Sequence, residues 1–253
     1  MSIFQAIMYG LLQGATEFLP VSSSGHLYLL SALLSDSADV GFFIWLHVGT
    51  LFAVVAIYRK QIWYLITHPK DKRLHWLLLS SVPTFILAAA YKFLMPNTAT
   101  PYLLPVGFAL TMALLLFNGK HKEGTLSTKR MKWHRAIIVG VVQGCAVLPG
   151  LSRSGSTICA LSLLDVKHED AVEFSFLLSI PVIIGGAAVD IYETVKYQLQ
   201  PTTLPLNILL GVIAAAITGI IAINLIRRLI KTDALNYFAF YMPIPLLLSI
   251  LIL

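Results

Sequence analysis

The 253-residue chain is 57% hydrophobic and only 12% charged, whereas about a quarter of the residues in a soluble domain are charged. This composition excludes an ordinary soluble domain and indicates an all-α integral membrane protein. The formal net charge of +6 does not indicate a nucleic-acid partner, because the basic residues lie in short loops between apolar segments.

Residues 2–34 form the first apolar element, and a polar turn divides it into two stretches. The second stretch, of about ten residues, is too short to cross a bilayer, because a spanning helix needs about 20 residues. We therefore predict a re-entrant helical hairpin that enters and leaves on one face of the membrane. Its turn lies in the sequence GLLQGATEFLPVSSSGH, from Gly10 to His26.

Three segments long enough, or nearly so, to span a bilayer follow this hairpin, at 41–58, 74–94 and 102–118. A basic linker, 119–130, separates them from a second predicted hairpin, 131–164. Three further spans are predicted at 170–190, 205–226 and 236–253.

The second half of the chain repeats the first. Its stretch GVVQGCAVLPGLSRSGST begins at Gly140, which follows its counterpart Gly10 by 130 residues. Residues 1–118 and 131–253 are therefore predicted to be two copies of one unit, each with a hairpin and three spans. Because three is odd, the copies have opposite orientations, which is the inverted-repeat layout of many transporters.

Lysine and arginine are unevenly distributed in this six-span arrangement. Fifteen lie on one side, whereas only Lys92 and Lys196 lie on the other. Cytoplasmic loops are enriched in these residues, so the basic side is predicted to be cytoplasmic and both termini to lie outside. The two hairpins are expected to pack against each other, because the GxxxG pairs that begin at Gly10 and Gly140 permit close helix contact.

Gln13 and Glu17 are four residues apart, so their side chains share one face of the first helix. The rest of this helix is apolar, which argues against a solvated polar face. Two oxygen-bearing side chains suit a hard cation such as Mg²⁺, which takes one or two protein carboxylates and completes its shell with water and phosphate oxygens. Glu17 and Gln13 are therefore predicted metal ligands.

Three serines, Ser22 to Ser24, precede Gly25 and His26 in the first turn. One of them is expected to cap the following helix. A serine beside a histidine also permits nucleophilic attack, with the histidine as proton acceptor. His47, within the first predicted span, is expected to face either this site or another span.

The second turn, Pro149 to Thr157, places Arg153, two glycines and four hydroxyls between apolar runs. The glycines permit close backbone approach, the amides at the following helix start favour an anion, and a guanidinium binds phosphate bidentately. The alternative is a capped turn from which Arg153 reaches the membrane interface. In an inverted repeat the two turns converge, so together they supply a metal ligand, a nucleophile, a base and an anion-binding arginine.

At these motifs the chain resembles the undecaprenyl-diphosphate phosphatase family, also called the bacitracin-resistance family. The first family signature, E or Q followed by x-x-x-E and then P-V-S-S-x-G-H, starts at Gln13 and ends at His26. The second, P-G-x-S-R-S-x-x-T, spans Pro149 to Thr157. The resemblance covers essentially the whole chain. Gln13 stands where glutamate is frequent, which removes one anionic metal ligand.

The resemblance implies hydrolysis of undecaprenyl diphosphate to undecaprenyl phosphate and inorganic phosphate, which recycles the lipid carrier for cell-wall synthesis and confers bacitracin resistance. It implies a divalent cation, Mg²⁺ or Ca²⁺, and a plasma (inner) membrane location with the active site open to the outer, periplasmic face. The expected partners are a polyprenyl diphosphate lipid and the membrane, without nucleic acid, and a homodimer is favoured.

Under this hypothesis Glu17 and Gln13 hold the cation, and Arg153 neutralises the transferring phosphoryl group. Ser23 is the expected nucleophile with His26 as proton acceptor, while a phosphohistidine at His26 and direct attack by water stay open. Phosphate oxygens are expected to contact Ser22, Gly150, Ser152, Ser154 and Thr157. A transporter is the alternative from another class, since inverted repeats are a transporter design. A lipid kinase is disfavoured, because no nucleotide-binding loop is present.

Overall fold

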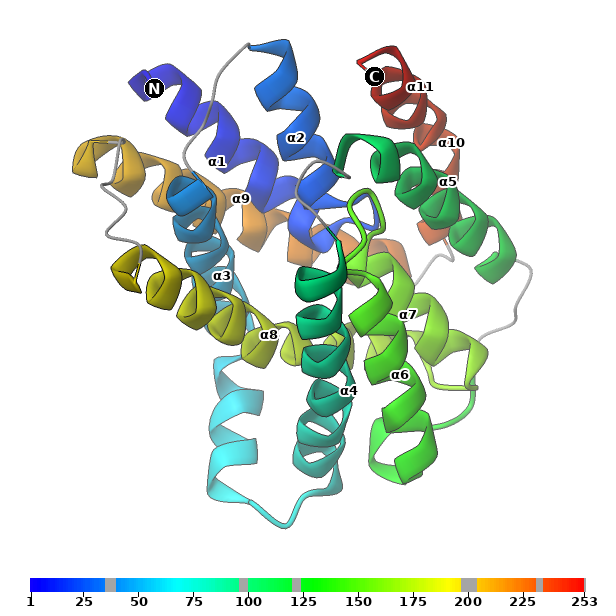
Figure 1. The fold of residues 1–253 in the computed structure, drawn as a ribbon. Helices are drawn as coiled ribbons and strands as arrows, with labels where there is room; N and C mark the ends of the chain where they lie inside the picture. Colours follow the sequence, from blue (N-terminus) through cyan, green and yellow to red (C-terminus); the bar gives the residue numbers. More distant parts are fainter. Residues whose placement is uncertain (35–39, 96–99, 120–123, 197–203, 231–233, 253) are drawn as a thin grey trace.

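The computed structural model describes residues 1–34, 40–95, 100–119, 124–196, 204–230 and 234–252. Its α-helices, labelled in Figure 1, are α1 (Ile3–Phe18), α2 (Ser23–Leu33), α3 (Val40–Thr67), α4 (Lys72–Leu94), α5 (Thr100–Asn118), α6 (Trp133–Cys145), α7 (Arg153–Leu163), α8 (His168–Lys196), α9 (Pro205–Leu229), α10 (Tyr237–Tyr241) and α11 (Pro243–Leu251). Two short 3₁₀ turns are η2 (Thr128–Arg130) and η4 (Ala234–Asn236). Residues 120–123 of the predicted linker and residue 253 of the last predicted span lie outside the described part, as does Lys231, one of the fifteen basic residues assigned to the cytoplasmic side.

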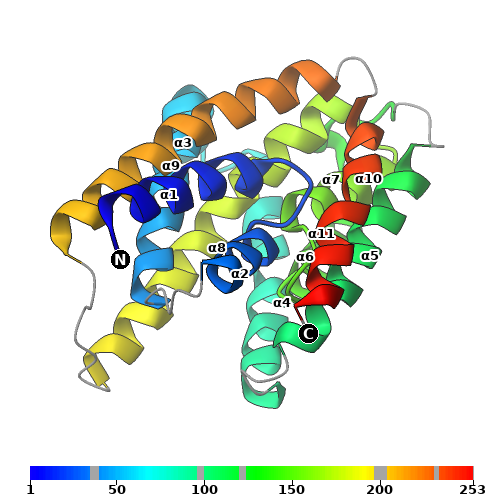
Figure 2. The same ribbon diagram turned by 90° about the horizontal axis from the view of Figure 1, so that it is seen from above.

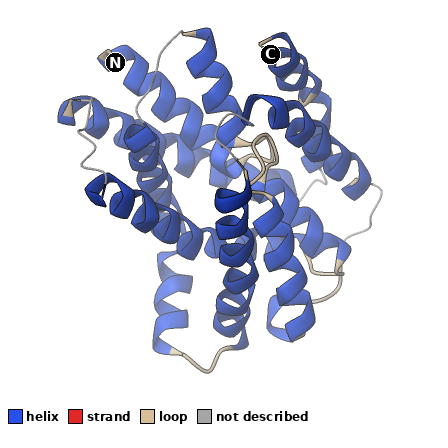
Figure 3. Ribbon diagram, viewed as in Figure 1, coloured by secondary structure: helices blue, strands red, loops and turns tan. Residues whose placement is uncertain are grey.

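The described residues are helices and loops, and Figure 3 shows no strand among them. One isolated bridge joins Leu126 to Val166. The prediction of an all-helical chain is therefore confirmed. Five helices are long and apolar enough to cross a membrane, namely α3, α4, α5, α8 and α9. These five contain the predicted spans 41–58, 74–94, 102–118, 170–190 and 205–226.

Large apolar side chains remain exposed along the outer face of α9. Leu209, Ile213, Ile217 and Ile221 recur at every fourth position and are 54%, 45%, 54% and 61% exposed. Side chains at this spacing form one stripe along a helix. A continuous apolar stripe of this length suits contact with lipid rather than with water.

The last predicted span differs from the observed structure. Residues 237–251 form two short helices, α10 and α11, which meet at Met242. Pro243 begins α11 and has no backbone N–H, so it cannot continue the hydrogen-bond ladder of α10. Together the two helices are shorter than a typical span, whereas the sequence predicted one continuous helix over 236–253.

The first span continues past its predicted end. The sequence predicted a span over 41–58, but α3 extends to Thr67 and is kinked at Tyr58, where the backbone angles (φ −101°, ψ 17°) depart from helical values. The added turns carry the first basic residues after the span, Arg59 and Lys60, which are exposed. A change from apolar to polar sequence therefore marked a bend rather than a helix end.

Both predicted hairpin segments form pairs of short helices, α1 with α2 and α6 with α7. The second helix of each pair starts at a serine cap. The hydroxyl of Ser22 accepts the Gly25 N–H at 3.4 Å, and that of Ser152 accepts the Gly155 N–H at 3.1 Å. The caps satisfy amides that a helix start otherwise leaves unpaired, so each polar turn ends by starting a new helix.

The glycine pairs make close contacts, but the contacts are not between the two hairpins. Gly10 lies against the backbone of Gly211 in α9, and Gly140 lies against the carbonyl of Ser80 in α4. Figure 2 shows α1 running alongside α9, and Figure 1 shows α6 alongside α4. The expected packing of one hairpin helix on the other is therefore replaced by packing on a long helix from the other half.

Small and hydroxyl-bearing residues on α4 and α9 explain why the hairpin helices pack on these two long helices. Ser80 Oγ donates to the Ala136 carbonyl at 2.7 Å, and Thr84 Oγ1 donates to the Gly140 carbonyl at 2.9 Å. On the other side, Gly211 leaves room for the backbone at Gly10. In an apolar environment such close backbone contacts and interhelical hydrogen bonds hold helices together.

Candidate functional site

The two polar turns meet, although they lie more than a hundred residues apart in the sequence. Ser154 Oγ donates to the carbonyl of Leu19 at 3.1 Å. Gly150 has φ +85°, a conformation that favours glycine, and packs against the backbone of α5. Gly25 packs between Phe108 and Gly150. The predicted convergence of the turns is therefore observed, and it occurs through their loops rather than through the glycine faces of α1 and α6.

Glu17 is the centre of the polar cluster where the turns meet. Its carboxylate is buried, and Oε1 accepts a hydrogen bond from Arg153 Nη2 at 2.5 Å. Oε2 accepts bonds from Ser23 Oγ at 2.5 Å and from Gln13 Nε2 at 3.0 Å. His47 Nε2 lies 3.8 Å from the same oxygen. Four elements, α1, α2, α3 and α7, therefore deliver side chains to one carboxylate.

The positions of these residues follow from local structure. Gln13 and Glu17 lie on one face of α1, as their spacing predicts. Ser23 and Arg153 are the first residues of α2 and α7, so each side chain projects from a helix start beside its turn. Positive charge from Arg153 beside the Glu17 carboxylate compensates the cost of burying both groups.

Two buried polar atoms in this cluster have no hydrogen-bond partner among the described residues. They are Arg153 Nη1 and Gln13 Oε1. Buried polar groups are usually paired, so an unpaired donor and an unpaired acceptor indicate a place for another molecule. The guanidinium can donate to an anion, and the amide oxygen can accept from a donor or bind a cation.

The polar cluster offers a hard cation few protein ligands. No group of three His, Cys, Asp or Glu side chains that could hold a metal occurs in the described part of the chain. A protein-only cage is therefore absent there. The Glu17 carboxylate and Gln13 Oε1 nevertheless fit a cation such as Mg²⁺, which retains several waters and takes further ligands from phosphate.

His26 does not contact Ser23 by any hydrogen bond in the described structure. Its Nδ1 lies 2.7 Å from the Ser22 carbonyl oxygen, which can only accept, so Nδ1 carries a proton. Its Nε2 lies 2.8 Å from the Tyr241 hydroxyl, and the two rings are stacked. In the neutral imidazole, Tyr241 therefore donates to Nε2. The sequence predicted that Ser23 pairs with His26, but in the structure Ser23 donates to Glu17.

The other residues predicted to contact phosphate are directed mainly to the protein. Ser152 caps α7, Ser154 bonds to Leu19, and Thr157 Oγ1 donates to the Arg153 carbonyl at 2.9 Å. Thr157 also lies 2.6 Å from Ser175 Oγ. Ser22 caps α2, and the Gly150 carbonyl accepts from Thr111. These contacts hold the turn in place. Arg153 is therefore the main residue of the second motif that can donate hydrogen bonds to an anion.

The sequence left the direction of one site residue, His47, open and gave no indication of another, Tyr241. His47 was an ionisable residue in an apolar span, which was a signal, but the sequence did not decide which way it faces. Its Nδ1 is bonded to the Phe43 carbonyl at 2.8 Å, so Nε2 faces Glu17. Tyr241 had no sequence signal, because it lies 215 residues from His26.

Known proteins match this chain over nearly its whole length. A family model described as bacitracin resistance protein BacA matches residues 6–246. A Halothermothrix orenii protein named undecaprenyl-diphosphatase is 38% identical over 248 residues, which cover 95% of this chain and 94% of that protein. A Methanococcus vannielii protein of the same name is 36% identical over 242 residues, covering 93% and 94%. One from Carboxydothermus hydrogenoformans is 35% identical over 244 residues, covering 95% and 94%.

Proposed function

The chain belongs to the bacitracin resistance protein BacA family, and we propose that it is a membrane enzyme that hydrolyses undecaprenyl diphosphate to undecaprenyl phosphate and inorganic phosphate. The observation that carries this proposal is the cluster of Glu17, Ser23 and Arg153, brought together from two distant motifs. The reaction recycles the lipid carrier for cell-wall synthesis and thereby confers bacitracin resistance. The substrate reaches the site from the membrane.

Ser23 is the proposed nucleophile, and Glu17 rather than His26 is its proton acceptor. Ser23 Oγ attacks the terminal phosphorus, its proton passes to Glu17 Oε2, and the bond from that phosphorus to the bridging oxygen breaks. Undecaprenyl phosphate leaves. Water then attacks the phosphoserine, phosphate is released, and the proton on Glu17 returns to Ser23. The hydrogen bond from Ser23 to Glu17 supports this order of events.

Arg153 supplies the positive charge for the transferring phosphoryl group. Its unpaired Nη1 can donate to phosphate while Nη2 holds Glu17. Phosphoryl transfer depends mainly on positioning and charge neutralisation, which a guanidinium at this position supports. His26, fixed by Ser22 and Tyr241, holds the turn that carries Ser23.

A divalent cation, Mg²⁺ or Ca²⁺, is proposed to be held by Glu17 and Gln13. When bound, it neutralises part of the negative charge of the diphosphate. Gln13 contributes its unpaired Oε1, and Glu17 contributes carboxylate oxygen. Gln13 carries no charge, so a weaker cation affinity is expected than for a pair of carboxylates.

The chain is proposed to be an inverted repeat of residues 1–118 and 131–253 joined by the linker 119–130. Reciprocal packing supports this arrangement, because α1 packs on α9 of the second half and α6 packs on α4 of the first. The sixth crossing would be made by α10 and α11 together. The proposal includes a plasma-membrane location with the site and both termini on the outer side, and a homodimer stays a prediction.

Phosphate release is the direct test. The purified protein in detergent is expected to release phosphate from undecaprenyl diphosphate with Mg²⁺ or Ca²⁺, and to lose at least about 100-fold in rate with EDTA, since a lost electrostatic partner costs this much. Absence of release from folded protein with either cation would contradict the proposal. Transport would then be tested by lipid movement across liposomes, because inverted repeats also occur in transporters.

Ser23 and Ser24 offer a matched pair of variants. Ser23→Ala is expected to lower turnover by about 10³-fold or more, because it removes the nucleophile. Ser24, which is exposed, is expected to tolerate alanine within about twofold. The assay is phosphate release, accompanied by trapping of phosphorylated protein in a rapid quench. Similar rates for the two variants, without trapped phosphoprotein, would assign the attack to water.

Tyr241→Phe tests the support of His26. Loss of the Tyr241 hydroxyl is expected to reduce turnover by about 2- to 10-fold, because one neutral hydrogen bond contributes about 0.5–1.5 kcal/mol. Tyr237→Phe, on the same short helix and 71% exposed, is the control and should behave as wild type. Equal rates for Tyr241→Phe and wild type would show that the hydroxyl does not support the turn during turnover.

A further inference from the structure

His47 of α3 faces the Glu17 carboxylate but has no part in the proposed transfer of the phosphoryl group. Its Nδ1 lies 2.8 Å from the Phe43 carbonyl oxygen, which can only accept, so Nδ1 carries a proton. In the neutral ring, Nε2 therefore has a free lone pair. That nitrogen lies 3.8 Å from Glu17 Oε2. The lone pair is thus directed toward a carboxylate oxygen, and neither atom donates to the other.

The distance of 3.8 Å between His47 Nε2 and Glu17 Oε2 suits a shared cation. It is longer than an N–H···O hydrogen bond, for which the two heavy atoms are about 2.7–3.2 Å apart. Metal bonds to nitrogen and oxygen are about 2.0–2.2 Å long, so two of them can together span up to about 4.3 Å. The separation therefore fits two ligands of one ion better than a direct hydrogen bond.

The bond from the His47 ring to a carbonyl is ordinary in this chain, but its surroundings are not. His75 Nδ1 of α4 also lies 3.0 Å from a carbonyl four residues earlier, that of Asp71, and His75 is exposed. The His47 side chain is 35% exposed and faces a carboxylate that is only 6% exposed. Histidines that bind metals commonly fix their second nitrogen on a carbonyl or carboxylate. His47 therefore combines a fixed ring, a nearby acid and access from outside.

Gln13 gives a second, independent sign of a missing partner at the same point. The residue is 0% exposed, and its Oε1 has no hydrogen-bond partner among the described residues. Its Nε2 donates to Glu17 Oε2 at 3.0 Å, so the amide lies beside the oxygen that His47 faces. Buried acceptors normally have partners, and a cation at this point would provide one.

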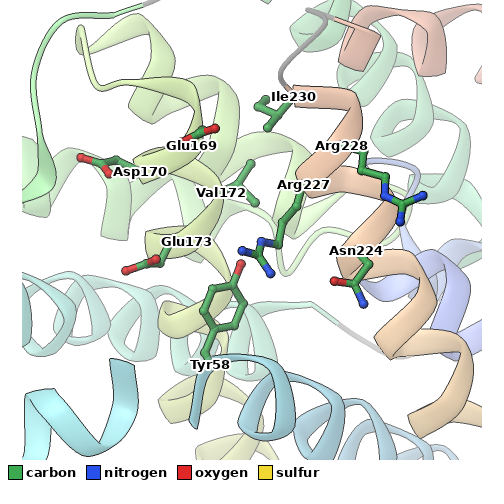
Figure 4. A pocket seen from close by; sticks show the side chains of 9 residues that line it. All are labelled: Tyr58, Glu169, Asp170, Val172, Glu173, Asn224, Arg227, Arg228 and Ile230. Carbon is green, nitrogen blue, oxygen red and sulfur yellow. The ribbon is translucent and has the colours of Figure 1, made fainter. Parts of the chain in front are cut away.

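The polar cavity between α3, α8 and α9 differs in this respect (Figure 4). Its volume is about 360 Å³, but none of the described residues that line it has an unpaired buried side-chain atom. Glu173 Oε1 lies 3.7 Å from Arg73 Nη1, and the Arg227 guanidinium lies 5.9 Å from the centre of the Tyr58 ring. Figure 4 shows Arg227 extending toward this ring. A missing ligand is therefore indicated beside His47 rather than in this cavity.

We propose that His47 Nε2 is a third protein ligand of the divalent cation, beside Glu17 and Gln13, and that it makes the site prefer a first-row transition ion such as Mn²⁺. This inference rests on the proposed function, which supplies the cation. Imidazole suits transition ions, whereas Mg²⁺ and Ca²⁺ prefer oxygen ligands. Glu17 Oε2 already accepts from Ser23 and Gln13, so the Gln13 amide turns over when the cation binds and Oε1 takes the place of Nε2.

Metal binding without turnover tests this assignment. The full-length protein is purified in detergent, freed of its purification tag and stripped with EDTA. Mn²⁺ binding is then followed by electron paramagnetic resonance, and Mg²⁺ and Ca²⁺ are measured by competition. Wild type is expected to bind Mn²⁺ at least about tenfold more tightly than either other ion. Pulsed spectra of the bound Mn²⁺ should show coupling to a nitrogen nucleus, as imidazole ligation requires.

His47→Gln separates a ligand from a structural residue. It should remove the nitrogen coupling and weaken Mn²⁺ binding by about 10- to 100-fold, the range for the loss of a supporting group at a metal site. Ca²⁺ affinity should change by less than about threefold, because the glutamine oxygen can replace the nitrogen for a hard ion. A structural loss would instead weaken all three ions together. His75→Gln is the control and should keep the wild-type coupling and affinities.

Three results would overturn the proposal: no nitrogen coupling in wild type, unchanged coupling in His47→Gln, or equal affinity of wild type for the three ions. Thermal melting in detergent checks that each variant is folded. Phosphate release without nitrogen coupling would reject His47 as a ligand and keep the phosphatase. Nitrogen coupling that depends on His47, in a protein that releases no phosphate, would keep the ligand and reject the phosphatase.

Discussion

Arg153→Ala is expected to lower phosphate release from undecaprenyl diphosphate by about 10³-fold or more, the range seen when an arginine that neutralises a transferring phosphoryl group is removed. Arg153 is the one residue in the cluster with both a bound acid and an unpaired buried donor among the described residues. Its removal takes positive charge from the place where negative charge develops. Steady-state rates at saturating lipid measure the loss.

Two companion variants separate charge from geometry. Arg153→Lys keeps the charge but cannot hold Glu17 with one nitrogen and phosphate with another, so it should recover only a small part of the rate. Arg130→Ala removes an exposed arginine outside the site and should match wild type. Near-normal turnover in purified Arg153→Ala would refute the assignment of Arg153 to the phosphoryl group.

Glu17→Gln is expected to reduce turnover by about 10²- to 10⁴-fold, because it removes the proton acceptor of Ser23. The same change leaves Arg153 partly buried without its acid. Removal of one partner from a buried ion pair costs about 3–5 kcal/mol, so the variant should also melt at a lower temperature. Both effects are measured on the purified protein in detergent, by phosphate release and by thermal melting.

The double variant Glu17→Gln with Arg153→Gln separates the two effects. Replacing both charges removes the unpaired guanidinium, so the double variant should melt closer to wild type than Glu17→Gln does. Its turnover should remain as low as that of the single variants. Recovery of turnover in the double variant would mean that neither Glu17 nor Arg153 takes part in the chemical step. Glu193→Gln, which alters an ion pair with Lys92 away from the site, serves as the control.

Local sequence patterns predicted most helices, because burial and chain length leave few choices in an apolar chain. Spacing also placed Gln13 and Glu17 on one face of α1, and serine caps marked the starts of α2 and α7. The patterns failed at 236–253, where composition favoured one span but Pro243 interrupts the ladder. They also failed at the glycine faces, since a glycine pair indicates close contact without naming the partner helix.

The sequence predicted most residues of the candidate site but not the hydrogen bonds between them. Neighbouring positions in the sequence suggested that Ser23 pairs with His26, yet the helix start directs Ser23 to Glu17 and His26 to Tyr241. The hydroxyls of the second motif similarly bond within the protein. Sequence proximity does not fix side-chain direction, because consecutive residues of a helix point about 100° apart.

The sequence by itself determined the all-helical apolar character of the chain, the two polar turns and the residue types gathered in them. These properties depend on local composition and spacing, which the chain carries in any fold. The tertiary structure alone decided that Arg153 and Glu17 form an ion pair, that His47 faces this carboxylate, and that the Arg227 guanidinium lies over the Tyr58 ring. Such contacts join residues of different helices, and their distances follow from how the helices pack, which no local pattern contains.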